Sequence, residues 1–248
     1  MPDARYLQNA PIIEALFDFQ VKARAEFRPE EFSSLKDRLA ARFPIAKERR
    51  GLQAKFSVVE GQGQPTVLED LGLQGYFFMT ADEKTIAQFR IDGFTFNRLS
   101  PYTRWDELFP LTMDLWDLYC SACRPEIATR LAVRYINRIL LPSAPFDFDS
   151  YLRAAPVVPP ELPQAVSGFV TRVTTHDQGN GVSANIAQAL EPGTQGQQSS
   201  LILDIDAFSQ REFPVGDPNI QRTFGQLRAF KNLIFFNSLT ETKLKEFE

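Results

Sequence analysis

The sequence predicts an α+β protein built from two similar units, residues 1–126 and 127–248, that share one antiparallel sheet with helices mainly on one face. Two observations lead to this fold. Stretches with the two-residue apolar alternation of strands are more numerous than stretches with helical spacing. The order of a strand, a helix, three or four strands and a long helix occurs once in each half of the 248 residues. Because 44% of the residues are hydrophobic, we expect the two units to pack as one domain with a sizeable core.

The first half begins with a strand over residues 11–21. Every second residue of this strand is hydrophobic, and together these residues form one apolar face. Glu14 and Asp18 belong to the opposite face. A helix follows over residues 29–43, where apolar residues return at helical spacing. The remaining elements are strands at 52–60, 74–81 and 84–98, and a long aromatic helix that starts at the N-cap Thr103 and closes at Arg124-Pro125.

The second half has a similar order. A strand over residues 128–141 leads into a stiff crossover at 142–163, which contains six prolines around a short helix. Strands at 166–176, 182–191 and 199–208 come next. A helix starts at Asp217-Pro218, and a short final helix lies near Ser238 and Glu241. The long helix carries one apolar stripe, made of Ile220, Phe224, Leu227 and Ile234.

A short repeated motif supports a duplication. Ile91, Asp92 and Phe94 precede the first long helix at the same distance as Ile205, Asp206 and Phe208 precede the second. Common strand patterning is the alternative source of this match. The order of elements is similar to that of the saddle-shaped TATA-binding protein, and a similarity at this level carries no function.

Composition and charge exclude several classes of protein. The net charge of −4 argues against nucleic-acid binding driven by bulk charge, although a local basic patch stays open. No stretch approaches the roughly 20 apolar residues that cross a bilayer, and the first residues lack the apolar run of a secretory signal. Two cysteines in a chain without an export signal indicate a reducing compartment, so we expect a cytoplasmic protein with no membrane partner.

The most unusual strand runs over residues 129–139. Its alternation places Arg130, Arg134 and Arg138 on one face, and places Leu131, Val133, Tyr135 and Ile139 toward the core. Planar guanidinium groups suit phosphate or carboxylate ligands. This face is therefore a candidate binding surface for a protein partner or an anionic ligand.

The same arginines have a purely structural interpretation. If the opening strands of the two units are neighbours, Glu14 and Asp18 face the arginines, with Asp92, Asp204 and Asp206 nearby. Cross-strand ion pairs of this kind contribute only about 0.2–1 kcal/mol each. Both interpretations stay open: a structural charge ladder, or a ladder that also recognises a partner.

Signals for catalysis are weak. His176 is the single histidine and falls in a predicted hairpin turn, and no zinc site with several histidines is available. Cys120 and Cys123 form a C-x-x-C at the end of a helix, where the helix dipole raises the pKa of a thiol. The carboxylates of Asp92, Asp204 and Asp206 leave a metal-dependent nuclease as an alternative. No phosphate-binding or dinucleotide motif is present, so we expect no cofactor and no bound metal.

Five segments in order resemble a sporadically distributed bacterial family without an assigned activity. They are Asn9-Ala10-Pro11-Ile12-Ile13-Glu14-Ala15, the aromatic block from Phe94 to Trp105, Arg134-Tyr135-Ile136-Asn137-Arg138, Ile202 to Phe208, and Lys231-Asn232-x-Ile234-Phe235. The resemblance implies a free-standing bacterial protein with no assigned enzyme activity. Patchy distribution is typical of mobile defence or toxin–antitoxin genes, which is an association and not a mechanism.

These observations favour a non-enzymatic binding protein over an enzyme. The expected site is the sheet face with Arg130, Arg134 and Arg138, and the expected partner is a protein or an anionic ligand. The runner-up is a protein that acts on nucleic acid, as a binder or as a metal-dependent nuclease. The sequence leaves a homodimer open.

Overall fold

Alternating strands build one large antiparallel sheet in the computed structural model, which describes residues 5, 7–55, 58–59, 62–63, 67–142, 147–193 and 198–248. The strands lie in the order β2-β5-β6-β7-β1-β8-β11-β10-β9, and a short β12 pairs with β8. Their bounds are β1 Ile12–Lys22, β2 Ile45–Lys55, β5 Val67–Met79, β6 Thr85–Arg90, β7 Gly93–Leu99, β8 Ile127–Leu140, β9 Val170–Asp177, β10 Val182–Glu191, β11 Ser200–Ser209 and β12 Phe213–Pro214. A separate two-stranded ribbon joins β3, Val58–Val59, to β4, Gln62–Gly63. The α+β class with a large antiparallel sheet is confirmed.

Strands β1 and β8 lie side by side at the middle of the sheet. They pair antiparallel, with Phe17 opposite Val133 and Asp18 opposite Ala132. The predicted alternation is confirmed here, because Ala15, Phe17 and Phe19 are fully buried. The side chains on the opposite face of β1 and β8 are therefore the ones available to a surface site.

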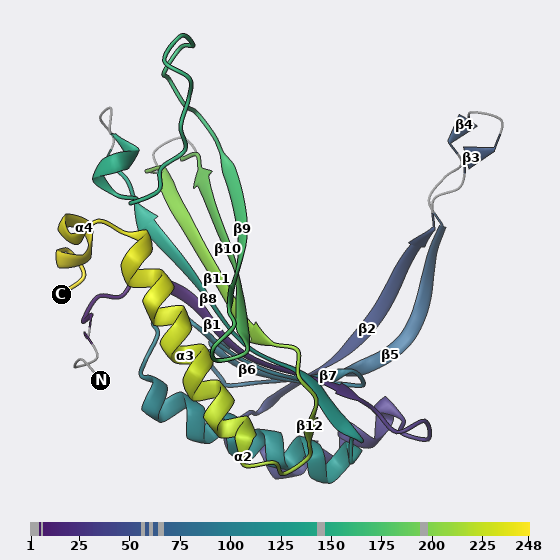
Figure 1. Ribbon diagram of the computed structural model, residues 1–248. Coiled ribbons are helices and arrows are strands. Elements are labelled where there is room, and N and C mark those ends of the chain that lie inside the picture. Colours follow the sequence, from purple (N-terminus) through teal and green to yellow (C-terminus); the bar gives the residue numbers. More distant parts are fainter. Residues whose placement is uncertain are drawn as a thin grey trace.

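Two long helices cover one face of the sheet. They are α2, Trp105–Cys123, and α3, Asn219–Ser238, and Figure 1 shows both on the same side. Phe19 stacks on Trp116 of α2 with ring centroids 4.3 Å apart, and it also contacts Phe224 of α3 at 4.8 Å. Aromatic side chains that each bury a large area thus fix both helices to the central strands.

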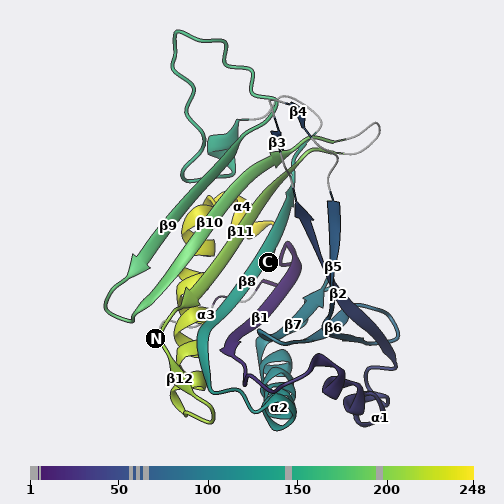
Figure 2. The same cartoon turned by 90° about the vertical axis from the view of Figure 1, so that its right-hand side faces the viewer.

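The opposite face of the sheet carries no helix among the described residues. Figure 1 shows that the β2–β5 hairpin and the strands β8, β11, β10 and β9 spread apart on the side away from α2 and α3. This face of the sheet is therefore concave. In Figure 2 the strands lie in front of α3, so the viewer looks onto the uncovered face. We call it the open face.

Several predicted boundaries in the first half are wrong. Of the predicted strand 52–60, residues 52–55 belong to β2, which starts at Ile45, and residues 58–59 form β3. Residues 56, 57 and 60 lie outside the described part. The predicted strand 84–98 is two strands, β6 and β7, separated by a turn at Ile91-Asp92. Gly93 permits this tight return, because a Cβ there would lie 2.1 Å from the carbonyl oxygen of Phe19.

The helix ends also differ in detail from the predictions. The predicted helix 29–43 is a 3-10 turn, η1 Pro29–Ser34, followed by a short α1, Leu35–Leu39. Thr103 is not the N-cap of α2, since Arg104 holds that place without a side-chain cap. The C-terminal end at Arg124 is confirmed, with that residue in the left-handed conformation.

The elements of the second half lie close to their predicted places. The crossover contains only a 3-10 turn, η2 Phe148–Ser150, and residues 143–146 are outside the described part. The last helix is α4, Glu241–Lys245, capped by the Thr240 hydroxyl. Within the described residues no helix is both long and apolar enough to cross a membrane.

Candidate functional site

The predicted arginines form a row on the open face of β8. Arg134 lies opposite Leu16 of β1 and opposite Asp206 of β11 in the strand register, so its side chain has neighbours on both sides. Arg134 and Arg138 are exposed, whereas Arg130 is 16% exposed. The row therefore runs from a half-buried end to an accessible end.

Each arginine of the row contacts a carboxylate. Arg130 donates to both oxygens of Asp206 at 2.8 and 2.9 Å, and lies 3.4 Å from Asp18. Arg134 donates two parallel hydrogen bonds to Asp204, at 2.8 Å from Nε and 2.5 Å from Nη2. The hydrogen bonding of Arg134 to the Asp204 carboxylate is the main reason that the pKa of Arg134 is raised. Bidentate contacts of this kind are among the stronger ion pairs.

Asp18 is the centre of the ladder on the β1 side. It accepts hydrogen bonds from the Thr95 hydroxyl at 2.6 Å and from Arg90 at 3.2 Å, in addition to its contact with Arg130. Its side chain is 17% exposed. This carboxylate thus joins three strands, β1, β7 and β8, and a fourth through Arg90 of β6.

Three predicted residues have other surroundings than expected. Glu14 accepts a hydrogen bond from Asn97 at 2.7 Å and forms no ion pair with the arginine row in the described structure. Arg138 pairs with Glu191 of β10 at 3.2 Å, a carboxylate that the sequence analysis did not connect to it. Asp92 lies in the β6–β7 turn, 75% exposed and 3.2 Å from Arg90, whereas Asp206 lies within β11. The two aspartates therefore do not occupy matching secondary structure, and Asp92 is not part of the β8 row.

Acidic and basic side chains are in direct contact along this row. We call the following set of residues the ladder: Asp18, Arg130, Arg134, Arg138, Asp204, Asp206 and Glu191. An arginine that already holds a carboxylate has fewer donors for an added anion. The arrangement is thus suited to a surface with ionic groups of both signs rather than to a phosphate chain.

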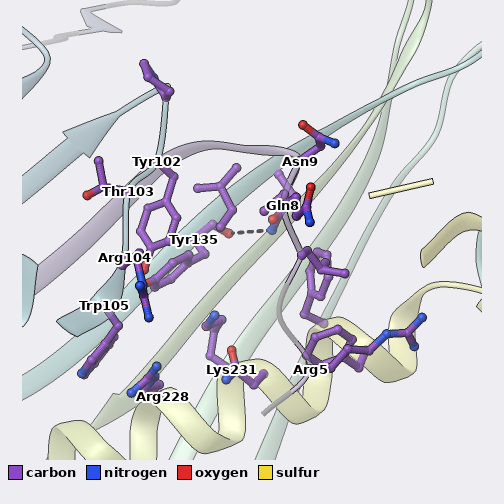
Figure 3. A pocket seen from close by; sticks show the side chains of 18 of the residues that line it. Arg5, Gln8, Asn9, Tyr102, Thr103, Arg104, Trp105, Tyr135, Arg228 and Lys231 are labelled. Carbon is purple, nitrogen blue, oxygen red and sulfur yellow. Dashed lines mark hydrogen bonds between the residues drawn. The ribbon is translucent and has the colours of Figure 1, made fainter. Parts of the chain in front are cut away.

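A second candidate site lies behind β8, on the helix side of the sheet. It is a pocket of about 510 Å³ between the N-terminal arm, the segment before α2, β8 and α3. Its walls include Tyr102, Trp105, Tyr135, Phe235 and Phe236. Figure 3 shows Lys231 and Arg228 from α3 around the same space as Tyr102 and Trp105.

Lys231 has an unusual place in this pocket. Its ammonium lies 3.9 Å from the centroid of the Tyr135 ring, and the Tyr135 hydroxyl lies 3.1 Å from that of Tyr102. Among the described residues no carboxylate pairs with Lys231. Burial, and then the charge of Arg228, lower the pKa of Lys231 to about 7. A lysine in such surroundings is a functional candidate.

Lys231 is not among the site residues predicted from the sequence, although the sequence contains a signal for it. Position 231 follows Leu227 by four residues and precedes Ile234 by three, so it belongs to the apolar stripe of α3. A lysine on such a stripe is placed against the core rather than in solvent. The stripe itself is confirmed, since Ile220, Phe224, Leu227 and Ile234 are all buried.

The remaining candidates show no catalytic arrangement. His176 lies on β9 and not in the turn, exposed, with Nδ1 2.8 Å from the Ser183 hydroxyl. Cys120 and Cys123 are free thiols at the end of α2, and burial raises the pKa of Cys123 to about 11. Within the described residues, no cluster of three or more histidine, cysteine or acidic side chains has the arrangement of a metal site.

No protein-family model matches the chain, and a search of curated proteins finds no match. The function must therefore be argued from the two sites just described.

Proposed function

We propose that the protein is a non-enzymatic binding protein that recognises a protein partner through the open face, with the ladder at its centre. The observation that carries the proposal is a concave sheet face without a covering helix, on which ionic groups of both signs alternate across β1, β8 and β11. A protein surface with acidic and basic side chains complements such a pattern, whereas a simple anion complements only its arginines.

The carboxylates that already pair with the arginines favour one of the two expected ligand classes. Arg134 donates from two nitrogens to Asp204, and Arg130 donates from Nη2 to both oxygens of Asp206. An added anion would therefore compete with carboxylates already in place. The same pairing argues against the nucleic-acid alternative, because Asp18, Asp204 and Asp206 lie beside the arginines and would repel the negative charges of a phosphate chain. A protein partner is thus the stronger of the expected ligands.

Site-specific crosslinking in the host cell tests the proposal. A photoreactive phenylalanine analogue replaces Ile136, which lies on the open face between Arg134 and Arg138, and in a matched protein it replaces Leu233, which is 59% exposed on α3. We expect a discrete crosslinked protein from position 136 and none from position 233. A band sensitive to nuclease would instead support the nucleic-acid alternative, and a band of twice the chain's mass would make the partner a second copy.

A charge exchange then tests the role of the ladder. Arg134→Glu combined with Asp204→Arg keeps an ion pair but reverses its direction, so we expect the crosslink to disappear. Lys22→Glu with Glu126→Lys is the control, since this exposed pair at 2.6 Å lies outside the ladder. If the first exchange lowers the melting temperature, Arg138→Glu with Glu191→Arg at the exposed end replaces it. A crosslink that survives both exchanges contradicts the proposal.

We further propose that the two halves, 1–126 and 127–248, arose by duplication and form a saddle. In support, β1 and β8 are antiparallel neighbours, each is followed by a 3-10 turn and further strands, and the halves end in helices of 19 and 20 residues. Superposing β1, β6, β7 and α2 on β8, β10, β11 and α3 is the check. A rotation near 180° that matches these pairs supports the duplication, and a match of α2 alone contradicts it.

Family membership, a cytoplasmic location and a role in bacterial defence stay predictions. They rest on the five segments that carry the resemblance and on cysteine usage. Growth of the host with and without the gene under phage challenge is the direct test of the defence role.

A further inference from the structure

The pocket behind β8 has the size and lining of a small-molecule site. Its volume of about 510 Å³ falls within the range of roughly 300–1,000 Å³ that is usual for ligand pockets. Aromatic side chains from α2, α3 and β8 form its walls, and amide groups of Asn9, Asn137 and Asn232 also line it. Apolar rings and polar or charged side chains thus line the pocket in about equal measure. Rings of this kind can hold the body of an organic ligand, and the polar groups can fix its orientation.

Segments that are far apart in the sequence meet at this pocket. Asn9 comes from the N-terminal arm, Tyr102 from the segment before α2, Tyr135 from β8 and Lys231 from α3. These four residues belong to four of the five segments that carry the family resemblance. The ladder residues belong to two of those segments, 134–138 and 202–208, or lie outside all five. The pocket therefore forms only where the fold brings these four segments together.

The charges at the pocket are unequally compensated. Arg5 pairs with Glu241 and Glu248, both at 2.7 Å, and Arg228 lies over the Trp105 ring with Asp106 at 3.5 Å. Lys231 meets the face of Tyr135 instead of a carboxylate among the described residues. The charged and titratable groups around it are Arg228 on its own helix and, from the neighbouring segments, Arg5, Tyr102, Arg104, Asp106 and Tyr135.

An ammonium that no carboxylate of the described residues pairs with indicates the charge of a ligand that would suit the pocket. Cationic groups predominate at the pocket, with Asp106 as an acidic side chain in its lining. Burial lowers the pKa of Lys231 because the charged form is poorly solvated. A negative group placed beside it would stabilise the ammonium and so bind more tightly than a neutral group of equal shape.

We propose that this pocket binds a small organic anion, a carboxylate or a phosphate monoester with a planar apolar body. Lys231 holds the anionic group, and Arg228, which stays beside Asp106, adds its positive charge nearby. Tyr102 and Trp105 pack against the body. The site lies on the opposite side of β8 from the ladder, so the proposal stands independently of the partner on the open face.

Ligand-detected NMR and calorimetric titration of the full chain test the proposal. The probes are benzoate and phenyl phosphate, which distinguish a carboxylate site from a phosphate site, and the neutral isostere benzamide. We expect saturable binding of one or both anions at millimolar concentration or below, and binding of benzamide weaker by about tenfold or more, as the loss of a charged hydrogen bond implies.

Three variants identify the residue responsible. Lys231→Met keeps the length of the side chain and should weaken anion binding by about tenfold or more. Lys245→Met, at an exposed position on α4, is the matched control and should leave affinity unchanged. Benzoate keeps one charge from about pH 6 to pH 8.5, so its affinity for the unchanged protein should fall as Lys231 loses its proton near pH 7. Lys231→Arg should bind benzoate with little change across that range.

Several results would overturn the proposal. They are the absence of saturable binding of both anions, equal affinity for benzamide, and Lys231→Met affinity equal to that of the unchanged protein. Circular dichroism of each variant separates a lost fold from a lost site. If Lys231→Met unfolds, the comparison of Lys231→Arg with the unchanged protein across the pH range decides the question.

Discussion

Arg134 and Tyr135 are neighbours in the chain, yet they face two regions of the molecule that treat charge in opposite ways. Arg134 points to the open face and is held by both oxygens of Asp204. Tyr135 points to the helix side, where its ring lies under the unpaired ammonium of Lys231. On the open face, other strands of the sheet supply a carboxylate for each arginine of the row, whereas α3 brings its lysine to a wall of aromatic rings.

The difference separates charges that stabilise the fold from the charge that our proposal assigns to ligand binding. A charge paired within the ladder gives up part of its hydration but gains a partner, so its removal harms the fold. A charge without a partner costs stability in the free protein, so its removal should help the fold and harm binding. Three substitutions can break or sharpen this contrast, and we order them by expected effect.

Removal of the charge at the centre of the ladder should have the largest effect. Asp18→Asn leaves Arg90 and Arg130, each 16% exposed, without their shared carboxylate. We expect a loss of about 2 kcal/mol in the free energy of unfolding, because a largely buried ion pair is broken by the loss of one partner. Urea unfolding followed by circular dichroism measures it. A loss below about 0.5 kcal/mol would mean that the ladder contributes little to the fold.

Removal of the lysine in the pocket should have the opposite sign. The pKa of Lys231 is about 7 in the folded protein and 10.5 in its ordinary state, so between these values the unfolded chain holds more protons and stability rises with pH. The penalty for the buried ammonium is full below about pH 7. Lys231→Met should therefore stabilise the protein by roughly 1 kcal/mol near pH 6.5, and less at pH 8.5.

Urea titrations of both proteins at these two pH values check this expectation. The quantity to compare is the difference between the two free energies of unfolding, because other groups titrate equally in both proteins. A difference that does not change with pH would show that Lys231 is not the group that titrates.

The exposed end of the ladder should show the smallest effect. Arg138 and Glu191 are 44% and 49% exposed, and exposed pairs contribute little because water screens them. Arg138→Gln should change the free energy of unfolding by less than about 0.5 kcal/mol. The same urea experiment measures it beside Asp18→Asn. Equal losses in the free energy of unfolding for the two variants would contradict the expectation that buried pairs of the ladder stabilise the fold more than exposed pairs do.

The strand periodicity was enough to predict the middle of the sheet but not its turns. The alternation in β1 and β8 identifies the buried face, and it predicts that Asp18 and Arg130 approach each other. Asp92 was misplaced because apolar alternation continues across a turn that depends on Gly93 passing close to Phe19. Such a close approach depends on a neighbouring strand and leaves no periodic signal.

The pocket was beyond prediction for a different reason. Its lining comes from four separate segments, and no local pattern states that Tyr102 and Lys231 are neighbours. The stripe on α3 contained a usable sign, a lysine among buried apolar residues. Helical periodicity places position 231 against the core, but it does not predict which side chains of other segments the lysine contacts there.

The central position of β1 also affects how the chain can be made. β1 pairs with β7 from its own half, but its other edge is paired by β8, which begins only at Ile127. During synthesis that edge stays open until the second half emerges, and an unpaired strand edge is a template for association with other chains. A fragment that ends before Ile127 should therefore self-associate, which size-exclusion chromatography would detect, and the full chain should depend on rapid arrival of β8.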